Sequence, residues 1–357
     1  MNAIPGDCGS EQSGQPSGAR GTAEVASGPE GGNPGRIYVE DWTAAFGTPY
    51  MIADDAERAE TSEVAEDGGS FTFHAGHPSE PGDLQLAFVD GVRRGDVSLY
   101  QEDSDSGAIA RGVAATHACG AVLCEEGSRP VIADVRVTRL VIWGSGVTGE
   151  LPPVAGGWSW KSESVATTAP DAPVRTLQTR MRQNEARLTE DLAQAGWHVV
   201  LDGPLHFVRY HHLPVCGYVK THARPYLPAE LHRQVRQLRG GERTSLFVLR
   251  GKDPGTQLYS CYLRLKDAAG DSGPWYGIVR LEFPVSAGLA AVTTEATRLA
   301  GLLPVYASLP HTDPRAPQNL QPIGALEREL RHRLGDARLA VRAVRASVAS
   351  LRLPSVA

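Results

Sequence analysis

Residues 84 to 143 hold a succession of apolar, β-branched runs, and this feature constrains the fold most. The runs are L-Q-L-A-F-V-D from 84, V-S-L-Y from 97, A-A-T-H-A-C-G-A-V-L-C from 114 and V-I-A-D-V-R-V-T-R-L-V-I-W from 131. Runs of this length and composition predict strands, and Arg94-Gly95-Asp96 predicts a tight turn between the first two. Consecutive strands without a long crossover are expected to pair antiparallel.

A helix and a returning strand follow this group. Leu177, Met181 and Leu188 recur close to a 3.6-residue period, which predicts a helix over 174–196. W-H-V-V-L-D at 197–202 predicts a buried strand, so the whole pattern indicates a mixed α/β domain. Later runs predict strands near 215–219, 244–250, 257–265 and 275–283, and helices near 227–239, 288–302, 322–334 and 336–350.

The first 83 residues differ in composition from the rest. Residues 1–35 are rich in Gly, Ser, Pro, Glu and Gln, which predicts a disordered tail because such a segment buries too little apolar surface. Residues 36–83 combine an aromatic-containing arm around Trp42 with an acidic linker, and residues 84–350 form the predicted main domain. The first 83 residues carry 15 Asp and Glu against 3 Arg, so the main domain is mildly basic although the chain's net charge is −6.

The cysteines and the apolar segments bear on location. The five cysteines include no C-x-x-C pair, which argues against a zinc site or a disulfide framework and fits a reducing cytoplasm. No run of 18 apolar residues occurs and no secretory signal is visible, so we expect no membrane span. The sequence has no P-loop motif, so any ATP-driven motor must be another protein.

Aspartate followed by glycine ends two of the apolar runs, at Asp90-Gly91 and at Asp202-Gly203. A carboxylate at such a place is costly unless a partner such as a divalent cation neutralises it. Glu185 flanks the apolar face of the helix before Asp202 and offers a third ligand. Three carboxylates that hold two metal ions about 4 Å apart suit phosphodiester hydrolysis. A turn at each Asp-Gly and a solvated helix face at Glu185 are the competing interpretations.

Taken together, these segments resemble the NurA nuclease family over roughly residues 84–347. The matching motifs are F-V-D-G-V at 88–92, V-V-L-D-G-P at 199–204, G-Y-V-K-T-H at 217–222, S-C-Y-L-R-L at 260–265, W-Y-G-I-V-R-L-E at 275–282 and D-P-R-A-P-Q-N-L-Q-P-I-G-A-L-E at 313–327. The resemblance implies an RNase H-like mixed sheet flanked by helices, a homodimer, and DNA cleavage that depends on Mn²⁺ (or Mg²⁺). The implied activities are 5′-to-3′ exonuclease and single-strand endonuclease, together with a hexameric HerA-type ATPase that translocates DNA, in end resection and repair or in phage defence.

The resemblance also assigns active-site positions. Asp90, Glu185 and Asp202 match the metal-binding residues of the family. The fourth position, a histidine in archaeal members, falls on Glu327 here, and His311 is the competing candidate. Glutamate oxygens suit Mn²⁺ or Mg²⁺, but glutamate transfers protons less readily than histidine near neutral pH.

Basic residues in and after the predicted strands are candidate DNA contacts, namely Lys220, His222, Arg264 and Arg280. An arginine inside an apolar strand needs a partner, and either a phosphate or a structural carboxylate such as Glu282 would serve. Residues 328–352 hold seven arginines and two acidic residues, which fits a DNA contact or a solvated helix face. The leading interpretation is a metal-dependent DNase. A non-catalytic DNA-binding adaptor that regulates a motor is the alternative, and an RNase or a resolvase on the same core also remains open.

Overall fold

The structure is a computed structural model that describes residues 62–77, 85–102, 109–209, 214–222, 225–250, 257–268, 270 and 272–351. All of these residues belong to one unit of the chain, Val39–Ala357. The predicted disordered tail at 1–35 and the aromatic arm around Trp42 lie outside the described residues.

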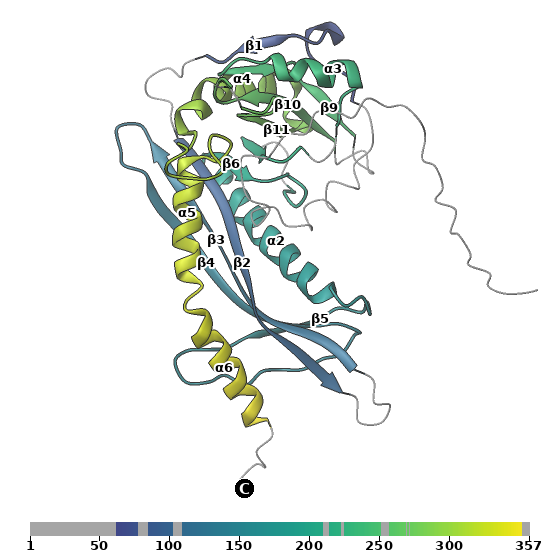
Figure 1. The fold of residues 1–357 in the computed structure, drawn as a ribbon, viewed down its shortest axis with the longest axis vertical. Helices are drawn as coiled ribbons and strands as arrows, with labels where there is room; N and C mark the ends of the chain where they lie inside the picture. Colours follow the sequence, from purple (N-terminus) through teal and green to yellow (C-terminus); the bar gives the residue numbers. More distant parts are fainter. Residues whose placement is uncertain are drawn as a thin grey trace, which may run out of the picture. The chain divides into compact units, whose positions relative to one another are not determined.

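One mixed sheet organises the described part of the chain (Figure 1). It has 11 strands in the order β1-β8-β10-β11-β7-β6-β2-β3-β4-β5, and β9 pairs with β10 beside this path. In chain order the strands are β1 (Phe73–Ala75), β2 (Gln85–Glu102), β3 (Ile109–Glu125), β4 (Val131–Trp143), β5 (Lys161–Ser164), β6 (His198–Asp202), β7 (Val215–Val219), β8 (Glu242–Thr244), β9 (Phe247–Leu249), β10 (Leu258–Arg264) and β11 (Ile278–Pro284).

Parallel and antiparallel pairs meet in the middle of this sheet. β2, β3 and β4 form an antiparallel meander, whereas β6 pairs in parallel with β2 on one side and with β7 on the other. The helix between the meander and β6 is α2 (Ala172–Gln194), and it supplies the long crossover that parallel pairing requires. The predicted helix over 174–196 and the mixed α/β class are therefore confirmed.

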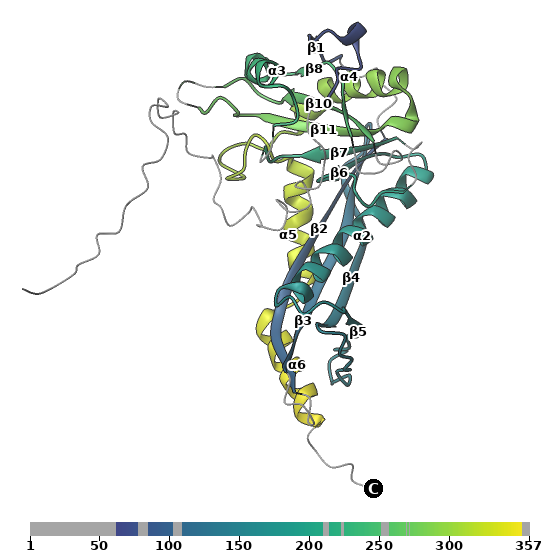
Figure 2. The same ribbon diagram turned by 90° about the vertical axis from the view of Figure 1, so that its right-hand side faces the viewer.

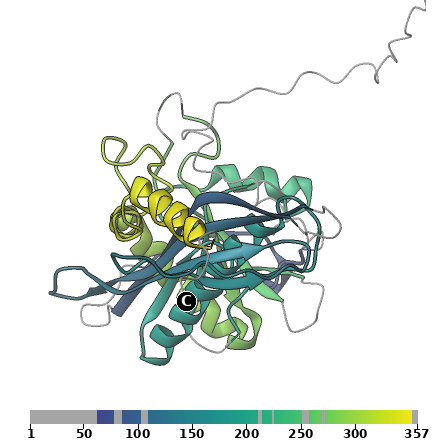
Figure 3. The same cartoon turned by 90° about the horizontal axis from the view of Figure 1, so that it is seen from below.

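Helices cover both faces of the meander. Strand side chains alternate between faces, so Phe88 packs with α5 (Gln321–Arg333) while its neighbour Ala87 packs with α2. Figures 1 and 2 show α5 and α2 on opposite sides of β2. In Figure 3, α6 (Ala337–Ser350) follows α5 on the same side of the strands.

The other described helices are shorter or lie near the β8–β11 end of the sheet, and Figure 2 shows them around that end. These other helices are α3 (Ala229–Gln234) and α4 (Leu289–Tyr306), with 3-10 turns at Asp67–Gly69, Val235–Gln237 and Val285–Ala287.

None of the helices among the described residues has the length and apolar character needed to cross a membrane.

The turn predicted at Arg94-Gly95-Asp96 is wrong, because β2 runs unbroken through these residues. Its register with β3 shifts between Gly95 and Val97, so a β-bulge takes up the extra residue. The Asp96 carboxylate accepts hydrogen bonds from Arg94 Nε at 2.6 Å and from Thr116 Oγ1 at 2.7 Å. These contacts hold Arg94-Gly95-Asp96 in the strand, although this sequence favours a turn.

The predicted acidic linker contains a segment that belongs to the sheet. Residues 62–77 contribute β1, which pairs with β8. Glu66 accepts hydrogen bonds from the Arg243 guanidinium at 2.7 and 2.8 Å and from Leu246 N at 2.8 Å. Arg243 is only 1% exposed, so Glu66 neutralises a charge inside the core. The folded domain therefore begins before the predicted boundary at residue 84.

Glu66→Gln should destabilise the protein by about 3 kcal/mol, because loss of one partner leaves the buried Arg243 charge without its counter-ion. Glu63→Gln is the matched control, since the Glu63 carboxylate is 79% exposed in its ion pair with Arg250 and should change stability little. Urea denaturation followed by circular dichroism measures the free energy of unfolding of both variants. Equal losses would contradict the structural role assigned to the Glu66–Arg243 pair.

Candidate metal centre

Asp90 and Asp202 lie side by side where the parallel strands β2 and β6 meet. The register pairs Val89 with Leu201, so the two aspartates are the next residues on neighbouring strands. β6 ends at Asp202, but β2 continues past Asp90, so Asp90-Gly91 is a mid-strand pair and forms no turn. Neighbouring strands are about 4.8 Å apart, which brings the two carboxylates within reach of one ion.

Helix α5 adds a third carboxylate on the same face. The ligand oxygens of Asp90, Asp202 and Glu327 all lie within 4.8 Å of one another. Asp90 is 5% exposed and Glu327 is 9% exposed, so the repulsion between these groups is poorly screened by water. Of the two candidates for the fourth position, Glu327 lies in this group, whereas His311 is exposed and outside it.

Glu185 approaches Asp90 from α2, on the opposite face of the sheet. Its side chain is fully buried, and a Cβ on Gly91 would overlap its Oε1. The Glu185 carboxylate occupies the position that a side chain on residue 91 would need. Only glycine fits there, because it has no Cβ. β6 ends beside Asp90, so the edge of β2 beyond that point has no neighbour from β6. This free edge lets groups from the two faces approach each other.

Two oxygens of this group have no hydrogen-bond partner among the described residues, namely Asp90 Oδ2 and Glu185 Oε1. Buried polar atoms nearly always have a hydrogen-bond partner. Two buried oxygens without one, on side chains that are neighbours in space, are therefore consistent with a site for a cation. Burial, followed by repulsion from the other three carboxylates, raises the pKa of Asp90. Burial also raises the pKa of Glu185, against the opposing charge of Arg182. A divalent cation would favour the ionised form of both.

Two side-chain cations contact Asp202 and Glu327. Lys220, directly after β7, donates from Nζ to Asp202 Oδ2 at 2.8 Å and to Asn319 Oδ1 at 3.0 Å. Arg315 donates to the two oxygens of Glu327 at 2.7 Å each. These two positive charges thus balance Asp202 and Glu327, while the oxygens without a hydrogen-bond partner are Asp90 Oδ2 and Glu185 Oε1.

Asp313 connects these two cations. It accepts hydrogen bonds from Asn319 Nδ2 at 2.6 Å and from the backbone N of Arg315 at 2.8 Å. Burial opposes ionisation of Asp313, but these hydrogen bonds and the Arg315 charge hold its pKa below the usual value. The resulting chain of contacts runs from Asp202 through Lys220, Asn319, Asp313 and Arg315 to Glu327.

Arg182 links helix α2 to the end of β6. Its Nη1 donates to Glu185 Oε2 at 2.9 Å and to the backbone O of Asp202 at 2.6 Å. Gly203 has a φ of +117°, and a Cβ there would lie 2.8 Å from Arg182 Nη1. The glycine after each aspartate therefore leaves room for a charged side chain of α2, Glu185 at Gly91 and Arg182 at Gly203.

The donor set fits a hard divalent cation. It consists of carboxylate oxygens alone, which Mg²⁺ and Mn²⁺ prefer, and it lacks the thiolate and imidazole groups typical of zinc sites. Asp90, Asp202 and Glu327 would hold an ion between them, and Glu185 would join from the other face of the sheet.

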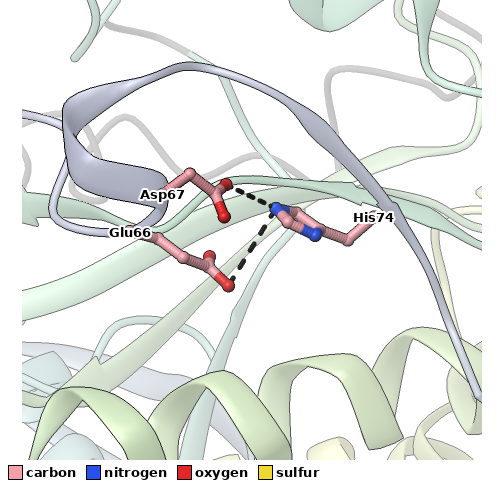
Figure 4. Close-up of side chains that lie close together, drawn as sticks. All are labelled: Glu66, Asp67 and His74. Carbon is pink, nitrogen blue, oxygen red and sulfur yellow. Dashed lines mark hydrogen bonds and ion pairs between the residues drawn. The ribbon is translucent and has the colours of Figure 1, made fainter.

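A second acidic group, Glu66, Asp67 and His74, has ligand atoms equally close together (Figure 4). Its oxygens are already used, because Glu66 binds Arg243 and Asp67 Oδ2 accepts hydrogen bonds from Ser245 Oγ and His74 Nε2 at 2.8 Å. None of these three side chains has a buried atom without a partner. This group therefore stabilises the attachment of residues 62–77 and does not have the free oxygens of the Asp90 centre.

Two of the four expected DNA contacts lie after β7. Lys220 is in the centre, where its ammonium group contacts Asp202. His222 donates from Nε2 to the backbone O of Ile278 at 2.8 Å, and its ring centroid is 4.7 Å from that of Trp275. Burial lowers the pKa of His222 to about 4, so its ring is uncharged at neutral pH and packs against Trp275.

The other two, Arg264 and Arg280, are buried among protein partners. Arg264 donates to the backbone oxygens of Tyr276 and Pro274 at 2.6 and 3.0 Å. Arg280 lies 3.2 Å from Glu282, which is the structural carboxylate considered from the sequence. Both arginines are at most 2% exposed, so they stabilise loops and strands of the domain and do not present their charge to a ligand at the surface.

Four residues of the centre were not predicted from the sequence to belong to it, namely Arg182, Asp313, Arg315 and Asn319. Arg182 lies three residues before Glu185, one helical turn away on the same face, and this spacing could have suggested the contact. The other three belong to the polar segment D-P-R-A-P-Q-N at 313–319. The connection of that segment to Lys220 is made across the fold and leaves no local pattern.

No protein-family model and no curated protein matches this chain. The carboxylate geometry and the contacts around it therefore provide the basis for a functional conclusion. The resemblance to NurA nucleases remains an expectation from the motifs.

Gly91→Ala should displace the Glu185 carboxylate, because the new Cβ would overlap Glu185 Oε1. We expect a loss of about 1–3 kcal/mol in stability, together with a smaller thermal stabilisation by Mn²⁺ than in the wild type. Gly95→Ala on the same strand is the matched control, since its Cβ would meet nothing closer than Val113 Cγ2 at 3.7 Å. Differential scanning calorimetry with and without Mn²⁺ measures both, and an unchanged Mn²⁺ response in Gly91→Ala would refute the role of Glu185.

Asp90→Asn should stabilise the metal-free protein at neutral pH, because it removes one of four crowded negative charges. Folding raises the pKa of Asp90 above 3.8, so its destabilising effect grows as the pH rises above that value and vanishes below it. The advantage of the variant should therefore shrink toward pH 4. Mn²⁺ at about 100 times its Kd should reverse the order by adding about 2.7 kcal/mol to the wild type alone.

Thermal unfolding across this pH range, in EDTA and in Mn²⁺, tests the Asp90 prediction. Asp191→Asn serves as the control, because the Asp191 carboxylate is 59% exposed in its ion pair with Arg136. A variant less stable than the wild type in EDTA at neutral pH would show that the Asp90 charge is already compensated.

Proposed function

We propose that the protein is a divalent-metal-dependent deoxyribonuclease with its centre at Asp90, Asp202, Glu327 and Glu185. The observation that carries the proposal is the convergence of carboxylates from two strands and two helices, with unsatisfied buried oxygens on Asp90 and Glu185. Clusters of this kind hold the ions that hydrolyse phosphodiester bonds.

The chain's own residues have separate tasks in this centre. Bound Mn²⁺ or Mg²⁺ would supply Lewis acidity and an activated water. The carboxylates orient the ions, and Arg182 fixes Glu185 relative to the end of β6. Lys220 is the cation best placed to contact a phosphate oxygen of the substrate, because it lies at Asp202. Glu327 is held by both donors of Arg315, which suits an ion ligand better than a group that shuttles protons.

The resemblance to NurA nucleases extends this proposal. It adds an RNase H-like core, a homodimer, Mn²⁺ as the metal, and 5′-to-3′ exonuclease and single-strand endonuclease activities. It also adds a HerA-type hexameric ATPase as the partner, in end resection or phage defence. The RNase H-like core is supported by the strand order β4-β3-β2-β6-β7, in which an antiparallel meander is followed by two parallel strands.

A non-catalytic adaptor is the second candidate, and one observation favours it. Lys220 and Arg315 already neutralise Asp202 and Glu327, as the side chains of a purely structural polar cluster would. In an adaptor these ion pairs would be permanent, whereas in the nuclease they would rearrange when the ions bind. Metal binding therefore separates the two candidates.

Purified protein should cut end-labelled single-stranded or duplex DNA in Mn²⁺ and not in EDTA. Asp90→Asn and Asp202→Asn should each lower the rate at least about 100-fold, the order expected when charge stabilisation at the reacting phosphate is lost. Asp191→Asn, at an exposed site on α2, should cut at the wild-type rate. DNA binding without cutting in any metal, with or without a candidate motor, would favour the adaptor. Cleavage of RNA and not of DNA would show that the centre is catalytic but that its substrate is RNA.

A further inference from the structure

Helix α6 carries only positive charges. Its charged residues are Arg338, Arg342 and Arg345, and all three are exposed. Their spacing of four and three residues places them on one face of the helix. They therefore form a single stripe of positive charge with no acidic residue in the helix itself.

The opposite face of α6 is already buried. Val344 packs with Leu99, Val141 and Trp143 of the meander, and Ala340, Ala343 and Ser347 are also buried. A basic amphipathic helix binds a membrane by inserting its apolar face, but here that face belongs to the protein core. The arginine stripe is thus the part of α6 that remains for a partner.

The stripe costs stability in the isolated protein. Like charges four residues apart on a helix repel each other, and Arg338 lies in the first turn, where the helix dipole disfavours a cation. Asp336 offsets part of this by capping the helix, with hydrogen bonds from Arg338 N and Leu339 N at 2.7 and 2.9 Å. Arg342 and Arg345 have no ion pair with any residue that the structure describes. A polyanion would supply the absent counter-charge.

Helix α5 also carries exposed arginines, close to the carboxylate centre. Helix α5 carries Glu327, and the exposed Arg328 and Arg331 lie on its outer side, with Arg331 Nη2 at 3.9 Å from Glu327 Oε2. α5 and α6 follow each other with only Leu334–Asp336 between them. Figures 1 and 2 show both helices running along the meander, with α6 farther from β6 than α5.

We propose that an arginine face binds the phosphate backbone of the DNA that leads to the carboxylate centre. This arginine face consists of Arg328, Arg331, Arg338, Arg342 and Arg345. The inference rests on the proposed nuclease function and names the path of its substrate. At about 1.5 Å per residue, Glu327 and Arg345 are separated by about 27 Å along the helix axes. That length corresponds to on the order of eight nucleotides at about 3.4 Å each. Arginine suits this role because its guanidinium can bind phosphate through two hydrogen bonds.

The test is equilibrium binding of fluorescent single-stranded DNA by the full chain in EDTA, where no cutting occurs. A triple substitution, Arg338→Gln with Arg342→Gln and Arg345→Gln, removes the α6 part of the arginine face and keeps helix propensity. Loss of three phosphate contacts should reduce the slope of log K against log salt by about 2. A 25-nucleotide strand should be affected strongly. A four-nucleotide strand spans about 14 Å and should be affected little, because α6 begins about 15 Å from Glu327 along the helix axis.

The matched control removes three other exposed arginines, Arg233, Arg236 and Arg239, by the same change to Gln. They lie in and after α3, at the opposite end of the domain from α6 in Figures 1 and 2. An unchanged salt slope in this control, with the expected loss in the α6 variant, supports the inference. Equal losses in both variants would show only non-specific charge attraction, and no loss in either would show that the arginine face does not contact DNA. Both results would overturn the inference.

Two further outcomes are distinguishable. Unchanged DNA affinity, with loss of binding to phosphatidylserine vesicles in the α6 variant, would overturn the inference in favour of a membrane surface. If the wild type binds DNA through the arginine face but never cuts it in Mn²⁺, the inferred DNA-binding face is supported and the proposed nuclease function is contradicted. Circular dichroism of both triple variants verifies that they are folded.

Discussion

The repulsion among buried carboxylates is the constraint on which the rest of this structure depends. Asp90, Asp202, Glu327 and Glu185 come from separate elements and meet where water screens their charges poorly. Each of these charges must be held in place by something stronger than its own preference for solvent. The large sheet, the packed helices and the ion pairs with Lys220, Arg315 and Arg182 provide this restraint. The fold therefore maintains an arrangement that the site residues would not adopt alone.

The end of β6 explains how the two faces of the sheet reach a common point. A continuous sheet would separate α2 from α5, since strand side chains alternate between them. Because β6 stops at Asp202 while β2 continues, the free edge of β2 becomes a place where groups from both layers meet. The parallel crossover through α2 produces this arrangement, and ligands commonly bind at such strand ends in α/β sheets.

Much of the framework could be predicted from the sequence, because it follows from local period. The helix that carries Glu185 and the strands that carry Asp90 and Asp202 are visible as apolar patterns. The bulge at Gly95 was missed, since only pairing with β3 overrides the turn preference of R-G-D. The partners of Arg264 and Arg280 also could not be predicted. A buried arginine looks the same in sequence whether it binds a phosphate, a backbone oxygen or Glu282. The contacts of Asn319 and Arg315 depend on how α5 docks, which is a property of the whole fold.

The ion pairs of Lys220 and Arg315 have a consequence for how strongly the centre binds metal. A cation that enters must share Asp202 with an ammonium group at 2.8 Å and Glu327 with a guanidinium at 2.7 Å. Metal loading would thus be an exchange of positive charges and not a simple addition. The affinity of the centre for a cation would be the free energy that the ion gains from the carboxylates minus the free energy that the two side chains lose. The two internal counter-ions would also allow the domain to fold without a metal ion, and they would set a threshold concentration below which the centre stays ion-paired.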